Sequence, residues 1–369
     1  MTTTSSEYRP VIYFATNHDW GSYQHFYQGL ALAFAATRPL LYVGSVVTGA
    51  QNLQADLNQV ADNVWSLNVR VPKGAGRHVL RPLRDRLIAR AVRRAVKRLG
   101  WETPPLVWTY TTDAAPYLRR APDSPSVYWT GDDVVDKFEP ALLRAVKHVF
   151  TVSPAATAKK RKLVDPSKVV EMPIATDPLR YESAAREKRV PRDLATLPRP
   201  WFGYGGAVNR RTDWQLMRAL AAATSGTVVV VGPPNDDEGR RQTSSQDKPP
   251  NVVFLGQRNA EQAPHYLAAF DVGLIPYVLS EFNLGSNPVK TYDYLAAGRP
   301  VVATNLPALY PLAPHVAIAK TDNQFIQMAL DAANQTGGEA ERQAVANRYS
   351  YDVLVARIDE VLGTATRLP

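Results

Sequence analysis

The sequence predicts two α/β domains, each built on a parallel sheet. Short apolar runs rich in β-branched residues alternate with helical patterns along the chain, and such continuous runs indicate strands covered on both faces. The length of 369 residues suits two domains of roughly 100–200 residues each. The runs form two sets of about six, which fits two sheets better than one wide sheet. The expected strands are 11–15, 40–43, 106–109, 126–129, 148–152 and 169–172, followed by 201–204, 227–231, 252–255, 272–276, 301–303 and 316–319.

We expect an N-terminal domain over 1–180 and a C-terminal domain over 195–345. The segment 174–200 between their cores is rich in charge and proline and breaks both periodicities, so the boundary is expected there. A last segment, 346–369, contains a helical pattern at Tyr351–Leu362 and is expected to form a terminal helix.

Composition narrows the classes of function. The chain has no cysteine, which excludes disulfides, zinc–thiolate sites and cysteine nucleophiles. Its start lacks a basic segment followed by an apolar one, so no signal peptide is expected and a cytoplasmic protein is predicted. The net charge of +9 favours acidic partners, such as an anionic membrane or a phosphorylated substrate.

Much of this positive charge lies on one predicted helix between Arg77 and Leu99. From Arg70 to Arg98 only Asp85 is acidic, whereas eleven residues are basic: 70, 73, 77, 81, 84, 86, 90, 93, 94, 97 and 98. Apolar residues recur at helical spacing at 80, 83, 87, 91, 95 and 99 and are expected to face the core. Two interpretations stay open: a solvated surface helix, or a platform for an anionic membrane. Nucleic acid is not expected as a partner, because no aromatic residues are interleaved with the charges.

The segment Ser286–Thr304, SNPVKTYDYLAAGRPVVAT, carries the most specific signal. Small polar residues and a proline begin a helix, Gly298 ends it, and an apolar strand follows. A helix N-terminus offers unpaired N–H groups and a partial positive charge, so it suits a phosphate. Lys290 would add a charge there, and Asp293, one turn later, could accept hydrogen bonds from ribose hydroxyls.

A glycine-rich turn in the same half adds to this prediction. Gly203–Gly206 follows an expected strand and would let the backbone approach a ligand closely, although such a turn alone is a weak signal. Arg210 and Arg211 come next, and Tyr277 ends another strand, where it either flanks a nucleotide or lies buried. The expected donor-binding residues are Gly205, Gly206, Arg210, Arg211, Tyr277, Ser286, Asn287, Lys290 and Asp293.

Asp132 and Asp133 are the candidate catalytic residues. They lie just past the carboxyl end of an expected strand, where open α/β sheets place ligands. Two adjacent carboxylates raise the pKa of one of them, which suits a general base. The alternative is that one of them only caps the following helix. No His-Glu-x-x-His and no Asp-x-Asp motif is present, and no metal site is predicted.

The segment 286–304 resembles the donor-nucleotide site of GT-B glycosyltransferases, in which a Pro-x-Lys…Glu-x-Leu-Ala-Ala-Gly-x-Pro-Val-Val run binds the nucleotide diphosphate. Within that group the sequence is most similar to bacterial polysaccharide glycosyltransferases of the teichuronic-acid type, and more distantly to the xanthan glucuronosyltransferase. Further segments resemble the same group in the same order: 17–20, 107–110, 127–133, 173–177, 202–206, 230–233 and 254–256. The resemblance implies a GT-B fold, with two Rossmann-like domains facing across a cleft and a C-terminal helix returning to the N-terminal domain.

The resemblance also implies a function. The C-terminal domain would bind a nucleotide-diphospho-sugar, expected to be UDP-linked, and the N-terminal domain an acceptor near His18, Asp19 and Trp20. The acceptor would be a saccharide or lipid-linked, in cell-surface polysaccharide or glycolipid synthesis, with no cofactor or metal. A lipid-linked acceptor would place the enzyme at the inner face of the plasma membrane.

The expected stereochemistry follows from one departure from the family pattern. Retaining members carry two glutamates at a fixed spacing, whereas here Asp293 takes the second position and Gly285 the first, with Glu281 out of register. An inverting mechanism is therefore expected. A UDP-sugar 2-epimerase of the same fold, and an inactive nucleotide- or lipid-binding module, remain the alternatives.

Overall fold

The structure is a computed structural model that describes residues 7–21, 26–73, 80–131 and 136–368. The chain forms two compact units. Unit 1 comprises residues 1–172 and 351–369, and unit 2 comprises residues 173–350. The boundary between the units therefore falls just before the segment 174–200, which forms two helices of unit 2.

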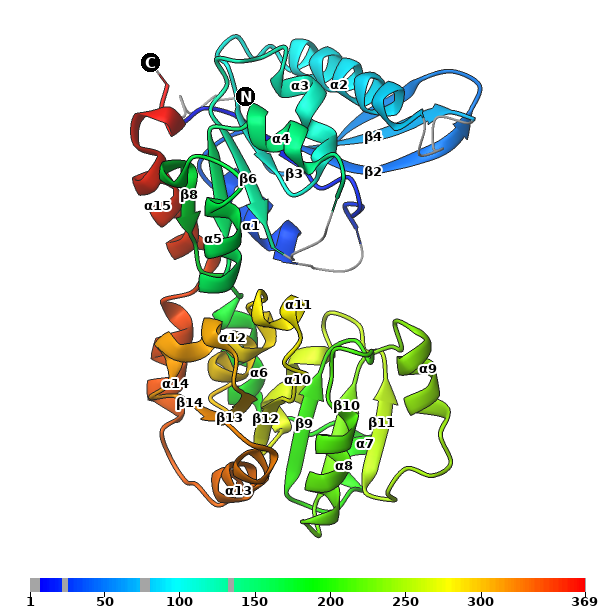
Figure 1. The fold of residues 1–369 in the computed structure, drawn as a ribbon, viewed down its shortest axis with the longest axis vertical. Helices are drawn as coiled ribbons and strands as arrows, with labels where there is room; N and C mark the ends of the chain where they lie inside the picture. The colour runs from blue at the N-terminus through cyan, green and yellow to red at the C-terminus, as the bar shows by residue number, and fades with distance from the viewer. Residues whose placement is uncertain (1–6, 22–25, 74–79, 132–135, 369) are drawn as a thin grey trace. The chain divides into compact units, whose positions relative to one another are not determined.

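Unit 1 is built on an eight-stranded sheet with the order β3-β4-β2-β1-β5-β6-β7-β8. Figure 1 labels β2, β3, β4, β6 and β8 of this sheet. All neighbouring strands run parallel except β3 and β4. The strands are β1 (Val11–Phe14), β2 (Leu40–Ala50), β3 (Gln54–Ala61), β4 (Val64–Pro72), β5 (Leu106–Thr109), β6 (Ser126–Thr130), β7 (His148–Thr151) and β8 (Val169–Glu171). Its helices are α1 (Phe26–Ala35), α2 (Arg81–Arg98), α3 (Ala115–Leu118), α4 (Glu139–Ala145), α5 (Pro154–Arg161) and α15 (Tyr351–Leu362).

The six strands expected in the first half are confirmed, but β3 and β4 were not predicted. These two strands form an antiparallel hairpin at one edge of the sheet, joined through Asp62 and Asn63. Asn63 has a positive φ of 57°, a conformation that asparagine tolerates well in a tight turn. Only β4 is well buried, and β3 at the edge alternates between partly buried and exposed residues. Its polar composition explains why apolar runs alone missed it.

Helix α2 begins at Arg81 and contacts β3, β4 and α3. The expected apolar face is wrong at its start, because Leu80 and Leu83 are 40% and 48% exposed. The rest of the expected face is confirmed, because Ala91 and Ala95 are buried and Leu87 and Leu99 pack against the core. The buried face is wider than expected and also includes Asp85, Ile88, Ala89 and Val92. At the exposed start of the helix, Arg84, one turn from Leu80, pairs with Asp113.

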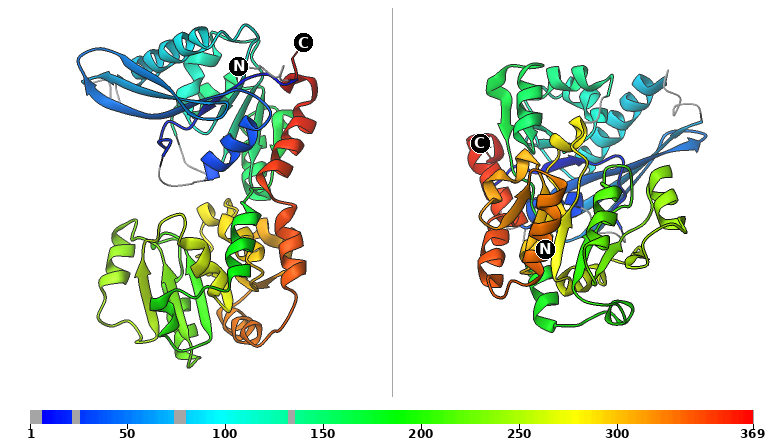
Figure 2. Two further views of the ribbon diagram at one scale, coloured as in Figure 1. Left: turned by 180° about the vertical axis from the view of Figure 1, so that it is seen from behind. Right: turned by 60° about the horizontal axis from the view of Figure 1, so that its bottom comes forward.

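Helix α15 occupies the residues expected for the terminal helix and packs against α1 (Figure 2). The ring of Tyr351 lies directly over Gly29, where an added Cβ atom would come within 2.3 Å of the ring. Arg38, at the end of α1, is buried and pairs with Asp359. The two ends of this helix pair are therefore joined by an aromatic contact and an ion pair.

Unit 2 is built on a six-stranded parallel sheet with the order β11-β10-β9-β12-β13-β14. Its strands are β9 (Trp201–Gly205), β10 (Thr227–Val231), β11 (Val252–Gly256), β12 (Val272–Ile275), β13 (Val301–Thr304) and β14 (Val316–Ala319), and all six were expected. Its helices are α6 (Pro178–Glu187), α7 (Arg192–Ala195), α8 (Trp214–Ala222), α9 (Asp237–Ser244), α10 (Ala263–Ala269), α11 (Glu281–Leu284), α12 (Val289–Ala296), α13 (Asp322–Ala333) and α14 (Glu339–Asn347).

The strand order of unit 2 is that of a dinucleotide-binding doubly wound sheet. The order reverses between β9 and β12, and ligands bind such sheets at the carboxyl ends of the two strands that flank this point. In unit 1 the corresponding reversal lies between β1 and β5. The strand order thus predicts one candidate ligand-binding edge in each unit.

Candidate functional site

Lys290 lies at the reversal point of the unit 2 sheet. It belongs to the first turn of α12, and its Nζ donates to Tyr277 Oη at 2.8 Å and to Tyr204 Oη at 3.3 Å. The ammonium also lies over both rings, 4.4 Å from the Tyr204 centroid and 4.8 Å from that of Tyr277. Because Tyr204 is part of β9 and Tyr277 follows β12, the lysine is positioned by the two strands that flank the reversal.

The glycine-rich turn reaches the same lysine. Gly206 has φ +145°, and a Cβ there would lie 3.0 Å from both Cε and Nζ of Lys290. A side chain at this position would therefore displace Lys290 as well as strain the backbone. The N–H groups of Gly205 and Gly206 donate within the protein, to Tyr294 Oη and the carbonyl of Val231. The turn thus brings its backbone close to Lys290 rather than offering these two donors to a ligand.

Arg211 is the second cation of a group that we call the Lys290 cluster and define as Lys290, Arg211, Tyr204 and Tyr277. Its guanidinium lies 4.4 Å from the ring centroid of Phe282 and 5.5 Å from that of Tyr277, the ring that also carries Lys290. Asn283 fixes it: the Asn283 amide oxygen accepts from Arg211 Nε at 3.1 Å, and its amide nitrogen donates to the Arg211 carbonyl at 3.0 Å. Asn283 belongs to α11 and is fully buried, so it fixes the orientation of the Arg211 side chain.

The cluster carries net positive charge. Burial opposes the charged form of Lys290, but the hydroxyls of Tyr204 and Tyr277 outweigh that effect and raise the pKa of Lys290 above its usual value, so the ammonium is charged at neutral pH. Within the described residues of unit 2, neither Lys290 nor Arg211 forms an ion pair with an acidic side chain. The start of α12 adds partial positive charge, because its N-cap residue Pro288 makes no side-chain cap. Such a group of donors suits a phosphorylated ligand.

Asp293 lies one turn after Lys290, and its carboxylate is already engaged. It accepts a hydrogen bond from Thr176 Oγ1 and another from Tyr181. Burial raises the pKa of Asp293 to about 6, although these two hydroxyls and the charges of Arg180 and Lys290 act in the opposite direction. The predicted ribose contact would be a further hydrogen bond to this carboxylate and stays a prediction.

The other expected donor-binding residues occupy different environments. Ser286 and Asn287 are buried, and their side chains bond to the Asn283 carbonyl and to Tyr292 Oη. Arg210 is exposed, and its backbone N–H donates to Asp236. Of the two adjacent arginines, therefore, Arg211 joins Lys290 and Arg210 does not.

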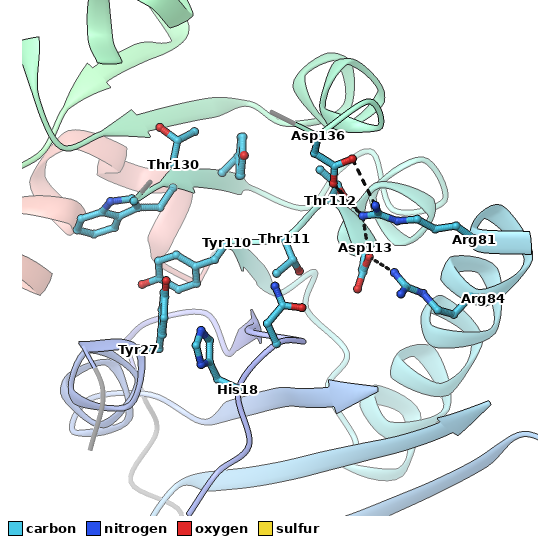
Figure 3. Close-up of a pocket in the computed structure, with 14 residues that line it drawn as sticks. His18, Tyr27, Arg81, Arg84, Tyr110, Thr111, Thr112, Asp113, Thr130 and Asp136 are labelled. Atoms are coloured by element: carbon cyan, nitrogen blue, oxygen red, sulfur yellow. Dashed lines mark hydrogen bonds and ion pairs between the residues drawn. The ribbon is translucent and has the colours of Figure 1, made fainter. Parts of the chain in front are cut away.

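Unit 1 contains a cavity of about 430 Å³ at its own reversal point. Residues that follow β1 and β5, together with β6 and the start of α2, form its walls (Figure 3). One wall is aromatic: His18 stacks on Tyr27 with 4.4 Å between ring centroids, and Tyr110 contacts Tyr27 edge to face at 4.4 Å. The complete lining is Asn17, His18, Tyr27, Arg81, Arg84, Tyr110, Thr111, Thr112, Asp113, Tyr128, Trp129, Thr130, Gly131 and Asp136.

The opposite wall is a network of ion pairs, which we call the Arg81 network and define as Arg81, Arg84, Asp85, Asp113 and Asp136. Arg81 donates to both carboxylate oxygens of Asp136, at 2.9 and 3.3 Å. Arg84 donates to Asp113 at 2.6 Å and to Asp85 at 3.1 Å (Figure 3 shows the pairs among the lining residues). Hydroxyls complete it, with Thr16 donating to Asp113 and Thr112 to Asp136, both at 2.7 Å.

The carboxylates of this network differ in basicity. The pKa of Asp136 is lowered: burial opposes this, but bonds from Thr112, the Phe138 N–H and Arg81 outweigh it. Burial, together with the charge of Asp113, raises the pKa of Asp85 to about 6 even though two arginines are near it. Asp136 is therefore a poor proton acceptor, and Asp85 does not line the cavity.

Of the expected acceptor-binding residues, only His18 lines the cavity. Trp20 packs against Tyr42 at 5.2 Å, and Asp19 accepts from the N–H of Ser45. Asp132 and Asp133, the expected catalytic pair, lie outside the described residues. Their neighbours Gly131 and Asp136 line the cavity.

Sequence reasoning missed several residues at both sites. In unit 2 these are Tyr204 and Asn283, and in unit 1 they are Tyr27, Tyr110, Arg81, Arg84, Asp113 and Asp136. One usable signal existed, because Tyr110–Asp113 directly follow an expected strand next to β1. No local pattern distinguishes Arg81 and Arg84 from the exposed basic residues of the same helix.

Comparisons with known proteins agree with this geometry. Residues 203–328, which contain the Lys290 cluster, match the family of glycosyl transferases group 1. A stretch of 59 residues is 44% identical to the putative teichuronic acid biosynthesis glycosyltransferase TuaH of Bacillus subtilis. Over nearly the whole chain the fold is similar to Anabaena Alr3699/HepE in complex with UDP and glucose, with a TM-score of 0.68 and 15% identity. These structural similarities show that the chain has a GT-B fold.

The extent of these similarities differs. The TuaH match covers 16% of this chain and 15% of TuaH, so the chain spans far less than two thirds of that relative. The HepE match covers 96% of this chain and 100% of the other. A UDP-forming α,α-trehalose-phosphate synthase from Burkholderia xenovorans in complex with glucose-6-phosphate matches with a TM-score of 0.69 and 11% identity, over 96% of this chain and 100% of that one. At these identities the structural matches establish the GT-B fold.

Proposed function

We propose that this GT-B protein transfers a sugar from a UDP-linked donor bound by unit 2 to a saccharide or lipid-linked acceptor bound by unit 1. The observation that carries the proposal is the Lys290 cluster. Two cations share the ring of Tyr277 at the reversal point of the sheet, within the segment that matches the glycosyl transferases group 1 family. The UDP complex of the similar HepE structure supports the choice of nucleotide.

The proposed role of the cluster is to stabilise the departing nucleoside diphosphate. When the bond between sugar and diphosphate breaks, negative charge develops on the leaving oxygen. Lys290 and Arg211 would stabilise that negative charge, and the first N–H groups of α12 would stabilise it further. The proposal requires no metal and no cofactor, and it assigns the electrostatic role to this chain's own cations.

The proposed acceptor site is the cavity of unit 1. The proposed base is Asp132 or Asp133, which lies between two cavity-lining residues in the sequence. It would take the proton of the acceptor hydroxyl as that oxygen attacks the anomeric carbon, with inversion. The low pKa of Asp136 and the engagement of Asp113 by three donors leave these two described carboxylates poorly suited to that role.

The proposed setting is cell-surface polysaccharide or glycolipid synthesis at the inner face of the plasma membrane. The named activity of TuaH supports the pathway. No helix in the described residues is long and apolar enough to cross a membrane, so the proposed attachment is peripheral. It would use the exposed basic residues of α2, which are Arg86, Arg90, Arg94, Lys97 and Arg98.

An assay of UDP release tests the proposed activity. UDP-sugars are incubated with the protein and a mixture of oligosaccharide and lipid-linked acceptors, and free UDP is measured. We expect release that depends on an acceptor, because the acceptor hydroxyl is the nucleophile. Conversion of a UDP-sugar to its 2-epimer without an acceptor would favour the epimerase, and nucleotide binding without any turnover would favour the inactive module.

A further inference from the structure

The charge of the cavity wall in unit 1 restricts the acceptor. Arg81 and Arg84 are the described lining residues with a permanent positive charge, and the carboxylates of the Arg81 network engage both. Two guanidinium groups face three carboxylates, those of Asp85, Asp113 and Asp136. The network is therefore neutralised from within and carries a surplus of negative charge when all three acids are ionised.

An anionic ligand would meet two obstacles in this cavity. Its phosphate or carboxylate would have to displace Asp113 and Asp136 from arginines that already hold them at 2.6–2.9 Å. The displaced carboxylates would then lie beside the new anion, and like charges at such distances repel strongly in a partly buried site.

A neutral, hydroxylated ligand meets neither obstacle. The stacked rings of His18 and Tyr27, with Tyr110 against them, offer an apolar surface for one face of a sugar ring. Carboxylate oxygens, threonine hydroxyls and the side chain of Asn17 offer hydrogen bonds along the other walls. Thr130 also lines the cavity, and its buried Oγ1 has no hydrogen-bond partner within the described residues.

We infer that the acceptor group entering this cavity is an uncharged sugar unit, bound through its hydroxyls, and that sugar phosphates and uronic acids are excluded by the Arg81 network. The inference rests on the proposed function, since it specifies the acceptor of the same transfer. It places any phosphate of a lipid-linked acceptor outside the cavity. Specificity then comes from repulsion of the wrong ligand as well as from attraction of the right one.

Matched pairs of sugars test the inference. Binding to the full-length protein in the presence of UDP is measured by ligand-observed NMR for glucose and glucose 6-phosphate, mannose and mannose 6-phosphate, and N-acetylglucosamine and its 6-phosphate. In at least one pair the neutral sugar should bind about tenfold more tightly or better, and in none should the phosphate be preferred. Tighter binding of any phosphate, or no binding of any neutral sugar, would overturn the inference.

A charge variant identifies the cause. Asp136→Asn keeps the side-chain shape but leaves Arg81 with less neutralisation, so the affinity of a sugar phosphate should rise about tenfold relative to its neutral partner. Asp193→Asn removes a comparable partner, that of Arg258 in unit 2, and should leave the ratio unchanged. An unchanged ratio in folded Asp136→Asn would overturn the inference, and the wild-type comparison decides alone if that variant fails to fold.

The two levels of proposal fail differently. Absence of UDP binding in the wild type would contradict the proposed function itself. Retained UDP binding together with a preference for sugar phosphates would contradict only the inference about the acceptor.

Discussion

The side chain of Lys290 is held in position and remains charged. Its ammonium is held by two tyrosine hydroxyls and two ring faces, yet no described acid pairs with it. The tyrosines fix its position without cancelling its charge. Lys290 is therefore already ordered before an anion binds, so binding costs less side-chain conformational entropy than it would for a flexible lysine.

Replacing Lys290 with Ala should remove the main charge-assisted contact to the diphosphate. We expect a loss on the order of 2–4 kcal/mol in transition-state stabilisation, measured as a fall in kcat/KM for UDP release. Arg210→Ala is the matched control, because that arginine is exposed and stands apart from the cluster in the structure. Similar losses in both variants, or none in Lys290→Ala, would refute the role given to Lys290.

The proposed base can be tested by changing one atom type. Asp132→Asn and Asp133→Asn keep the side-chain volume but cannot take a proton, so turnover of the correct variant should fall by about 100-fold or more. UDP affinity should stay near the wild-type value, because the donor cluster belongs to unit 2. Asp123→Asn, an exposed position of unit 1, serves as the control. Wild-type turnover in both variants would move the role to His18, the imidazole on the cavity wall.

Asp293 should make the stability of unit 2 dependent on pH. Its folded-state pKa of about 6 lies above the usual value of 3.8, so the folded state holds the proton more tightly. Its contribution to the free energy of unfolding is therefore complete below pH 4 and is lost as the pH rises through 6. The expected loss is about 3 kcal/mol by pH 8.

Asp293→Asn isolates that effect, because asparagine does not titrate. The free energy of unfolding of the variant minus that of the wild type, from urea titrations, should increase by about 3 kcal/mol between pH 4 and pH 8. Titration of other groups, including Asp85 in unit 1, cancels in this difference. A difference that is constant with pH would show that the carboxyl is not desolvated.

At the scale of elements, the basic residues of α2 form two groups with different surroundings. Arg81 and Arg84, in its first turn, belong to the cavity wall, whereas Arg86, Arg90, Arg94 and Lys97 are exposed. The helix therefore contributes to the cavity wall at its N-terminus and presents positive charge to solvent along its outer face. Only these exposed residues bear on the proposed attachment to a membrane.

Reversing the outer charges should abolish attraction to an anionic membrane. Each basic residue near such a surface contributes about 1 kcal/mol, so changing Arg86, Arg90, Arg94 and Lys97 to Glu should eliminate sedimentation with phosphatidylserine vesicles at low salt. Reversal of Arg186, Lys188, Arg189 and Arg192, which are exposed in unit 2, is the control with an equal change in net charge. Equal loss in both variants, or equal recovery of wild type with neutral vesicles, would leave α2 as a solvated surface.

At the scale of the molecule, the proposed donor site and the proposed acceptor site belong to different units, each with its own sheet. Each unit has its own core and its own reversal point, so donor binding should stabilise unit 2 selectively. A ligand at 100 times its Kd adds about 2.7 kcal/mol to the free energy of unfolding of the unit that binds it.

Thermal unfolding should test whether unit 2 binds the nucleotide. UDP should raise the unfolding temperature of wild type more than GDP or dTDP does, and the increase should be strongly reduced in Lys290→Ala. Glucose without UDP should produce no comparable shift through unit 2. An equal response to all three nucleotides would contradict the preference for UDP.

The sequence by itself determined the features that depend on neighbours along the chain. Twelve strands and the terminal helix were predicted correctly, because a continuous β-branched run or a 3.6-residue period is a local property. The segment 286–304 likewise predicted a helix start carrying Lys290, since proline, polar residues and the lysine are adjacent in sequence.

Only the tertiary structure decided which of several equivalent residues reach a site. Arg210 and Arg211 are neighbours in sequence, yet Asn283, 72 positions away, selects Arg211. Arg81 and Arg84 look like their basic neighbours on α2 until Asp113 and Asp136 approach them from other elements. Pairings of this kind depend on distances between remote segments, and no local periodicity encodes them.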